Sequence, residues 1–231
     1  MNDKTKTKTQ LIDELEKARQ RISQLEKTLD KSKDNEILLC EIHHRVRNNM
    51  QIISSLLRLQ FRKIKDKKLL ETLKVCQGRI RSMALIHDKF YHSKNFAKIE
   101  LAQYIQDLAL LIFRSHGVKP DSIRLNAELE EIQLDIDRAI PFGLMANELL
   151  TNSLKHAFPD GKKGEIQISL RPIGQGKFEF VVSDNGVGFP KDLDFHATHS
   201  LGMQLVNTLV EQIEGTIELY KGEGTKFKIT F

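Results

Sequence analysis

The sequence predicts an α+β protein in which a helical N-terminal part precedes an α/β sandwich. Apolar residues recur every three to four positions in the first part of the chain, which is typical of amphipathic helices. Beyond it, short stretches in which apolar and polar residues alternate, typical of strands, lie between further helical patterns. We place the division near residues 93–98 and expect two regions, 36–95 and 96–231, after an N-terminal extension.

The N-terminal extension contains the first two predicted elements. Residues 1–10 are polar and are expected to be disordered. Residues 11–35 are predicted to form a short coiled coil, because their apolar residues alternate in steps of four and three. These residues are Leu11, Leu15, Ala18, Ile22, Leu25 and Leu29. The coiled coil is expected to bring two chains together.

Residues 36–95 are predicted to form a helical hairpin. The stripe of the first helix comprises Leu39, Ile42, Val46, Asn49, Ile53 and Leu56. After a Lys-rich turn, the stripe of the second comprises Leu69, Leu73, Ile80, Met83 and Ile86. A hairpin alone covers one face of each helix, so we expect a homodimer in which two hairpins form a four-helix bundle.

Residues 96–231 are predicted to form the α/β sandwich, of roughly 130 residues. Its helices are expected at Leu101–Arg114, Asp137–Ala157 and Leu201–Glu214. Its strands are expected at Ser122–Leu129, Gly164–Leu170, Lys177–Asp184, Thr216–Tyr220 and Thr225–Phe231.

Composition excludes several classes of protein. The formal charge of +5 comes from basic stretches without interleaved aromatic residues, so nucleic-acid binding is not expected. No apolar run approaches the ~18 residues of a membrane span, and no membrane contact is expected. The two cysteines, Cys40 and Cys76, form no CxxC pair, which favours the reducing cytoplasm. The His196-x-x-His199 pair lacks the further ligands of a zinc site.

Two adjacent histidines on the first hairpin helix face different directions. With Ile42 at zero and about 100° per residue, His43 lies beside the apolar stripe and His44 points away from it. Glu41 and Asn48 share the outward ridge, where the carboxylate can accept a proton and the amide can hold a water or an oxyanion. His44 is therefore the candidate nucleophile, although two surface histidines alone would fit the same pattern.

The helix expected at Asp137–Ala157 contains a candidate cation site. Glu148 and Asn152 are four residues apart and project together, and Lys155 follows one turn later. Oxygen donors so placed suit Mg²⁺, and the lysine suits a phosphate. Alone, this spacing is common on helices that bind nothing.

Three glycine sites follow downstream. Asp184 ends a strand and precedes Gly186 and Gly188, whose backbone permits close approach of a flat base while the carboxylate accepts from an amino group. Ser200-Leu201-Gly202 opens a helix whose exposed N–H groups suit phosphate oxygens. Gly224-Thr225 is the third. Neither a GxxxxGK[ST] loop nor a GxGxxG motif occurs, so the P-loop and dinucleotide folds are excluded.

Taken together and in order, these motifs resemble a known family. The segments 147–156, 184–188, 200–202 and 222–225 are similar to the N, G1, G2 and G3 boxes of the histidine-kinase and gyrase type of ATPase, the Bergerat fold. His43-His44-Arg45-Val46-Arg47-Asn48-Asn49 resembles the H-box of sensor histidine kinases with Arg-Val-Lys-Asn after the acceptor, which are related to the HWE kinases. The likeness covers residues 36 to 231.

The resemblance implies a homodimeric kinase that binds ATP and Mg²⁺, phosphorylates His44, and passes the phosphoryl group to an aspartate of a response regulator. It assigns adenine to Asp184, Mg²⁺ to Asn152 and a phosphate to Lys155. The other residues that it implies for the nucleotide are His156, Gly186, Gly188, Ser200, Leu201, Gly202, Gly224 and Thr225. The segment from Phe189 to Ser200 would be the lid over the nucleotide.

Two residues depart from the pattern of the largest kinase group. Glu148 stands where many histidine kinases carry asparagine, and its role as a base or as a ligand of a metal-bound water stays open. Arg45 stands where an acidic residue commonly follows the acceptor, so Glu41 is the candidate base.

Two alternatives remain: a protein serine kinase or chaperone-like ATPase, and a coiled-coil scaffold with a degenerate nucleotide domain. The last predicted strand ends at Phe231, so the receiver domain of the regulator is expected in a separate chain unless the sequence is part of a longer protein.

Overall fold

The computed structural model describes residues 21, 38, 41–61, 64–92, 98–119, 121–190, 195 and 200–231. The chain divides into two compact units, Met1–Ile42 and His43–Phe231. The predicted disordered segment 1–10 and, apart from residue 21, the predicted coiled coil 11–35 lie outside the described residues. The second unit contains all the elements discussed below.

The helical hairpin is present. Its first helix runs through residues 43–61 and its second, α2, through Lys67–His92. Asp66 caps α2 by accepting from the backbone N–H of Lys68, at 2.8 Å. The Gln77 side chain donates to the carbonyl of Ser54, at 2.9 Å, and His43 contacts His87 nearer the open end. Because 43 pairs with 87 and 54 with 77, the two helices are antiparallel.

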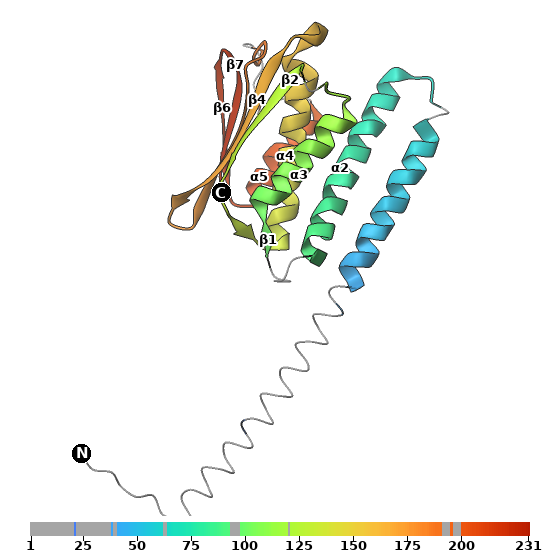
Figure 1. Cartoon of the computed structure of the whole chain (residues 1–231), viewed down its shortest axis with the longest axis vertical. Coiled ribbons are helices and arrows are strands. Elements are labelled where there is room, and N and C mark those ends of the chain that lie inside the picture. Colours follow the sequence, from blue (N-terminus) through green and yellow to red (C-terminus); the bar gives the residue numbers. More distant parts are fainter. Residues whose placement is uncertain are drawn as a thin grey trace, which may run out of the picture. The chain divides into compact units, whose positions relative to one another are not determined.

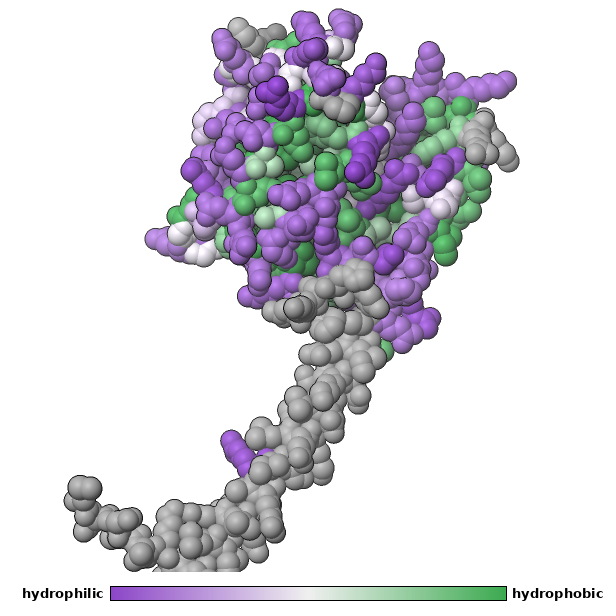
Figure 2. All heavy atoms as spheres, viewed as in Figure 1, coloured by the Kyte–Doolittle hydropathy of each residue, from purple (hydrophilic) through white to green (hydrophobic). Residues whose placement is uncertain are grey.

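The apolar residues of the first helix are divided between two sides. His43 and Ser54 are buried toward α2, with Val46, Met50 and Leu57 partly buried. By contrast, Ile52, Ile53, Leu56 and Leu59 are exposed in the single chain, and Figure 2 shows apolar residues along this outer edge of the hairpin. Of the predicted stripe, Val46 is partly buried, whereas Ile42, Asn49, Ile53 and Leu56 are exposed, so the face that α2 covers lies beside the predicted stripe and not on it.

The remaining elements follow in the order shown in Figure 1. The strands are β1 Ile99–Glu100, β2 Ile123–Leu129, β3 Gln133–Leu134, β4 Gly164–Gly174, β5 Lys177–Asp184, β6 Thr216–Gly222 and β7 Gly224–Thr230. The helices are α3 Leu101–Ser115, α4 Ile136–Asn152 and α5 Leu201–Gln212, with a π-helical turn at Ser153–Ala157 and a 3₁₀ turn at Pro159–Gly161.

A five-stranded mixed sheet forms one layer. Its strand order is β2-β4-β5-β7-β6, with β2 and β4 parallel and the other neighbours antiparallel. Strands β1 and β3 form a separate antiparallel pair. Along β4, Ile166, Ile168 and Leu170 are buried while Gln167 between them is exposed, so one face of the sheet is covered and the other is open.

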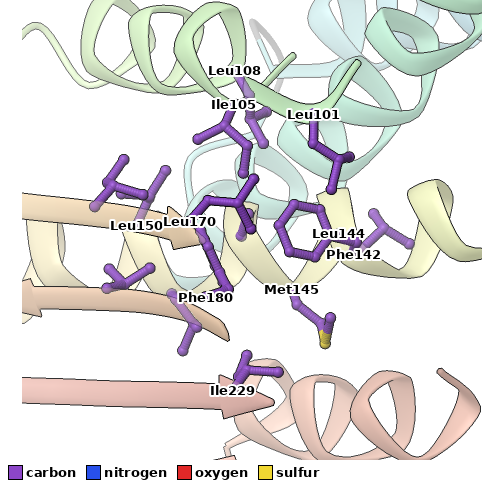
Figure 3. Close-up of a cluster of buried hydrophobic side chains, with 14 of the residues drawn as sticks. Leu101, Ile105, Leu108, Phe142, Leu144, Met145, Leu150, Leu170, Phe180 and Ile229 are labelled. Carbon is purple, nitrogen blue, oxygen red and sulfur yellow. The ribbon is translucent and has the colours of Figure 1, made fainter. Parts of the chain in front are cut away.

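Helices α3, α4 and α5 lie on the covered face (Figure 1). Helix α2 packs on the outer side of α3 and α4 and contributes Ile86 and Phe90 to the same core. Figure 3 shows the part of this core in which side chains of α3 and α4 meet those of β4, β5 and β7; the labelled residues are Leu101, Ile105, Leu108, Phe142, Leu144, Met145, Leu150, Leu170, Phe180 and Ile229. The second compact unit therefore includes both the hairpin and the sandwich.

The α+β fold class is confirmed, and the differences from the predicted elements are local. The predicted helix 137–157 is α-helical only to Asn152 and then widens into the π-helical turn. The strand predicted at 164–170 continues to Gly174. The pair of β1 and β3 was not predicted, because two-residue strands are too short to show a period.

Candidate active site

Asp184 organises the end of β5. Its Oδ1 accepts from the backbone N–H groups of Gly186, at 3.1 Å, and Thr225, at 3.2 Å. Its Oδ2 accepts from the Ser153 hydroxyl, at 2.9 Å. The side chain is 7% exposed. The Asp184 carboxylate thus connects the backbone at Gly186 and at Thr225 to Ser153, the residue after α4. These three hydrogen bonds fix its position.

The glycines around Asp184 are required by close backbone contacts. A Cβ on Gly186 would overlap the carbonyl of Ala157, which accepts from the N–H of Val187 at 2.9 Å. Gly224 has a φ of 84°, and its Cβ would overlap the carbonyl oxygen of Asp184. Gly188 has a φ of 83°, a conformation that L side chains rarely adopt. The backbone here leaves no room for side chains.

Gly224→Ala is expected to destabilise the protein by about 2–4 kcal/mol, because the backbone here has a positive φ and the added Cβ would meet the carbonyl oxygen of Asp184. The melting temperature should fall by roughly 5–15 °C. Gly222→Ala is the matched control on the same hairpin, because a Cβ there meets no atom within 4 Å. Equal melting temperatures for the two variants would contradict the proposed constraint.

The two predicted Mg²⁺ ligands, Glu148 and Asn152, lie on α4 beside the start of α5. The amide nitrogen of Asn152 faces the sulfur of Met203 at 3.5 Å, which leaves its carbonyl oxygen for a cation. Asn152 therefore fits a Mg²⁺ ligand. The Glu148 carboxylate lies close to Gly202, whose Cβ would be 2.8 Å from Oε2, but both of its oxygens accept from Arg79.

The other residues predicted for the nucleotide lie on the π-helical turn after α4 and at the start of α5. Lys155 and His156 are exposed on the π-helical turn, and both line a cavity that α2 and α3 also border. Ser200 is the residue before α5, and Leu201 is exposed at its first position. Most of the predicted lid, residues 191–194 and 196–199, lies outside the described residues.

The two histidines of the first hairpin helix have different surroundings. His43 is 9% exposed, its Nδ1 lies 2.9 Å from Nδ1 of His87, and its ring packs against Phe90 with centroids 4.3 Å apart. His44 is exposed, and its Nδ1 lies 3.2 Å from the amide nitrogen of Asn48. Of the two rings, that of His44 is the one that another molecule or domain can reach. Glu41 is exposed and belongs to the other compact unit.

Acidification is expected to destabilise the hairpin through His43 and His87. Burial lowers the pKa of both rings, and the charge of His43 lowers that of His87 further. Because the pKa of both rings in the folded protein lies below the unfolded value of about 6.5, the unfolded chain binds more protons than the folded chain does. The part of the free energy of unfolding that depends on these rings is therefore fully present above this pH and is lost as the pH falls through the folded pKa. The melting temperature should therefore decrease below about pH 6.5. His87→Gln should flatten this decrease, and an unchanged slope would contradict the assignment.

Three residues of the site were not found from the sequence: Arg79, Ser153 and His87. Arg79 pairs with Glu148, Ser153 with Asp184, and His87 with His43. Ser153 adjoins the predicted Asn152, but its type alone gave no signal. Arg79 and His87 lie on α2, where ordinary helix spacing did not distinguish them from surface residues.

A cluster of metal-ligating side chains and a membrane-spanning helix are both absent from the described part of the chain. No group of three or more His, Cys, Asp or Glu side chains is arranged there to hold a metal ion. Among the same residues, no helix has both the length and the apolar character that crossing a bilayer requires. His196 and His199, considered above for zinc, lie outside the described residues.

Comparison with known families agrees with the order of the motifs. The family model described as "Histidine kinase" matches residues 41–116, and the model described as "Histidine kinase-, DNA gyrase B-, and HSP90-like ATPase" matches residues 138–231. The first match contains His43 and His44, and the second contains all the predicted nucleotide boxes.

Two curated relatives share much of this sequence. Sensor histidine kinase PdtaS of Mycobacterium tuberculosis (strain ATCC 25618 / H37Rv) is 35% identical over 179 residues, which cover 77% of this chain and 35% of the relative. Blue-light-activated histidine kinase 2 of Erythrobacter litoralis (strain HTCC2594) is 25% identical over 198 residues, covering 84% of this chain and 56% of the relative. The chain thus spans little more than a third to a half of these proteins.

A solved structure has the same arrangement of elements. The histidine kinase domain from Erythrobacter litoralis EL346 blue-light activated histidine kinase aligns with a TM-score of 0.64 and 25% identity, over 87% of this chain and 94% of that chain. The chain therefore belongs to the histidine kinases, with the histidine-bearing helical region of this family followed by its ATPase domain.

Proposed function

We propose that the chain is the kinase core of a two-component sensor, which phosphorylates His44 from MgATP and then transfers the phosphoryl group to an aspartate on the receiver domain of a response regulator in a separate chain. The observation that carries the proposal is the convergence of the nucleotide boxes on α4 and Asp184 in a chain that also exposes His44. The cytoplasm, where reduced Cys76 would persist, is the proposed location.

Each nucleotide box has a proposed role. Asp184 accepts from the adenine amino group, and Gly186, Gly188, Gly224 and Thr225 let the backbone approach the base. The first N–H groups of α5, at Ser200, Leu201 and Gly202, bind phosphate oxygens. Lys155 and His156 contact phosphates, and the carbonyl oxygen of Asn152 binds Mg²⁺, which when bound neutralises phosphate charge.

In the proposed transfer, a ring nitrogen of His44 attacks the γ-phosphorus. The new P–N bond forms as the bond to the β,γ-bridging oxygen breaks, and the electron pair leaves with ADP. The contact with Asn48 decides which nitrogen is nucleophilic. If the amide is turned so that its oxygen accepts from Nδ1–H, Nδ1 is the protonated nitrogen and Nε2 carries the attacking lone pair. Glu41 remains the proposed base for this ring.

The class of reaction is tested by incubating the protein with γ-labelled ATP and Mg²⁺. A phosphohistidine gives label on the chain itself that is lost in acid and stable in alkali, as the proposal expects. Acid-stable label, or label that appears only on an added partner, would favour the serine-kinase alternative. A melting temperature that MgATP leaves unchanged, together with no label, would favour the scaffold.

The outer edge of the hairpin supports a homodimer. Ile52, Ile53, Leu56 and Leu59 are exposed there in the single chain, and burying such a face against a second copy is favourable at roughly 25 cal/mol per Å². A four-helix bundle of two hairpins would bury it.

Leu56→Glu is expected to shift the protein toward the mass of one chain, 26.6 kDa, because it places a charge in this proposed interface. Light scattering after size exclusion measures the mass. Leu110→Glu is the matched control, because Leu110 is also exposed but lies on α3. A dimer that persists in the Leu56 variant, or dissociates equally in both, would place the interface elsewhere.

A further inference from the structure

Arg79 of α2 and Glu148 of α4 form a bidentate ion pair. Arg79 Nε donates to Oε1 at 2.9 Å, and Nη2 donates to Oε2 at 2.8 Å. The side chains are 17% and 4% exposed. This geometry is among the strongest that an arginine and a carboxylate can form, and it connects a helix of the histidine hairpin to the helix of the nucleotide site.

The remaining surroundings of the Glu148 carboxylate are also occupied. The side chain of Asn147 donates to Oε1 at 3.2 Å. On the other side, a Cβ on Gly202 would lie 2.8 Å from Oε2, so the first turn of α5 packs directly against the carboxylate. Both oxygens are therefore engaged, within a site bordered by α2, α4 and α5.

This arrangement conflicts with both roles open to Glu148. A base must present a carboxylate oxygen to the proton that it takes, but Oε1 and Oε2 both accept hydrogen bonds from Arg79, and Oε1 also accepts from Asn147. A ligand of Mg²⁺ or of its water must tolerate a cation nearby, but the guanidinium charge lies within hydrogen-bond distance of both oxygens. While Arg79 is bound, Glu148 is blocked in either role.

Further contacts hold α2 in this position. The buried hydroxyl of Ser82 lies 3.1 Å from the Tyr104 hydroxyl and donates to the carbonyl of Gly143 at 3.3 Å. Lys89 of α2 forms an ion pair with Asp107 of α3. When α2 is packed against the sandwich in this way, Arg79 is therefore also in place to bind the Glu148 carboxylate.

We propose that Arg79 is an autoinhibitory latch, which holds Glu148 away from catalysis while α2 is docked on α4 and must release it before phosphoryl transfer. The inference rests on the proposed kinase function. It couples the position of the hairpin to the nucleotide site, because movement of α2 away from α4 frees the carboxylate. The Lys89–Asp107 pair connects α2 to α3 without touching Glu148, and as a partly exposed ion pair it contributes little to the docking of α2.

The first test compares initial rates of autophosphorylation at saturating MgATP in wild type, Arg79→Gln and Lys89→Gln. Arg79→Gln is expected to be about tenfold faster than wild type. Lys89→Gln is expected to change little. Arg79→Lys keeps the charge but loses the bidentate geometry, and should be intermediate. If Arg79→Gln binds nucleotide normally but labels at the wild-type rate or slower, the latch is excluded, and a slower rate would make Arg79 a positioning residue for Glu148.

A second readout does not depend on activity. Hydrogen exchange over 67–92 is measured with and without Mg²⁺ and a non-hydrolysable ATP analogue. The latch predicts that the analogue accelerates exchange in wild type, and that Arg79→Gln exchanges faster even without it. Exchange that is unchanged in both comparisons would overturn the latch. If the exchange result is as expected but wild type gives no acid-labile label, the proposed function fails and the conformational coupling stands.

Discussion

His44→Gln is expected to reduce acid-labile labelling from ATP to background, whereas His43→Gln is expected to keep it. His44 is exposed, while His43 is buried against Phe90 and paired with His87. Glutamine retains polarity and approximate size but cannot form a phosphoramidate of the imidazole type. The loss should therefore be complete for the residue that is the acceptor.

The measurement is the initial rate of labelling, with the MgATP-induced thermal shift recorded for each variant. His44→Gln should retain that shift, because it lies outside the nucleotide boxes. His43→Gln should lower the melting temperature of the hairpin, since it replaces a buried contact. Loss of label in the His43 variant alone, with nucleotide binding intact, would reverse the assignment of the acceptor.

Asp184→Ala is expected to weaken ATP binding by about a hundredfold or more. It removes the proposed acceptor for the adenine amino group, and a hydrogen bond to a charged group contributes about 1.5–3 kcal/mol. It also leaves the N–H groups of Gly186 and Thr225 and the Ser153 hydroxyl without this partner, so the site itself should loosen. Calorimetric titration with ATP measures the affinity.

A milder substitution separates binding from stability. Asp184→Asn retains a carbonyl oxygen for the two backbone donors, and should fold while binding ATP weakly. Asp121→Ala, at an exposed position before β2, is the control and should bind as wild type does. Wild-type affinity in Asp184→Asn would show that adenine is recognised through another group.

Local sequence pattern predicted most of the fold. β5 was predicted with its observed bounds, because the apolar residues Phe178, Phe180 and Val182 stand at every second position before Asp184. α3 was predicted to within one residue, since its apolar spacing is that of a helix and Gly117 follows its end. The π-helical turn was not predicted, because a change from four-residue to five-residue hydrogen bonding leaves no trace in apolar spacing.

The sequence by itself determined which chemical groups are present and in what order: an exposed histidine ridge, an oxygen-donor pair on one helix, and glycines after Asp184. These are local features, read over a few residues at a time. Only the tertiary structure decided their partners, because Arg79 and Glu148 are 69 positions apart, His43 and His87 are 44 apart, and Ser153 and Asp184 are 31 apart. Contacts over such separations depend on how helices and strands pack, and no local period encodes them.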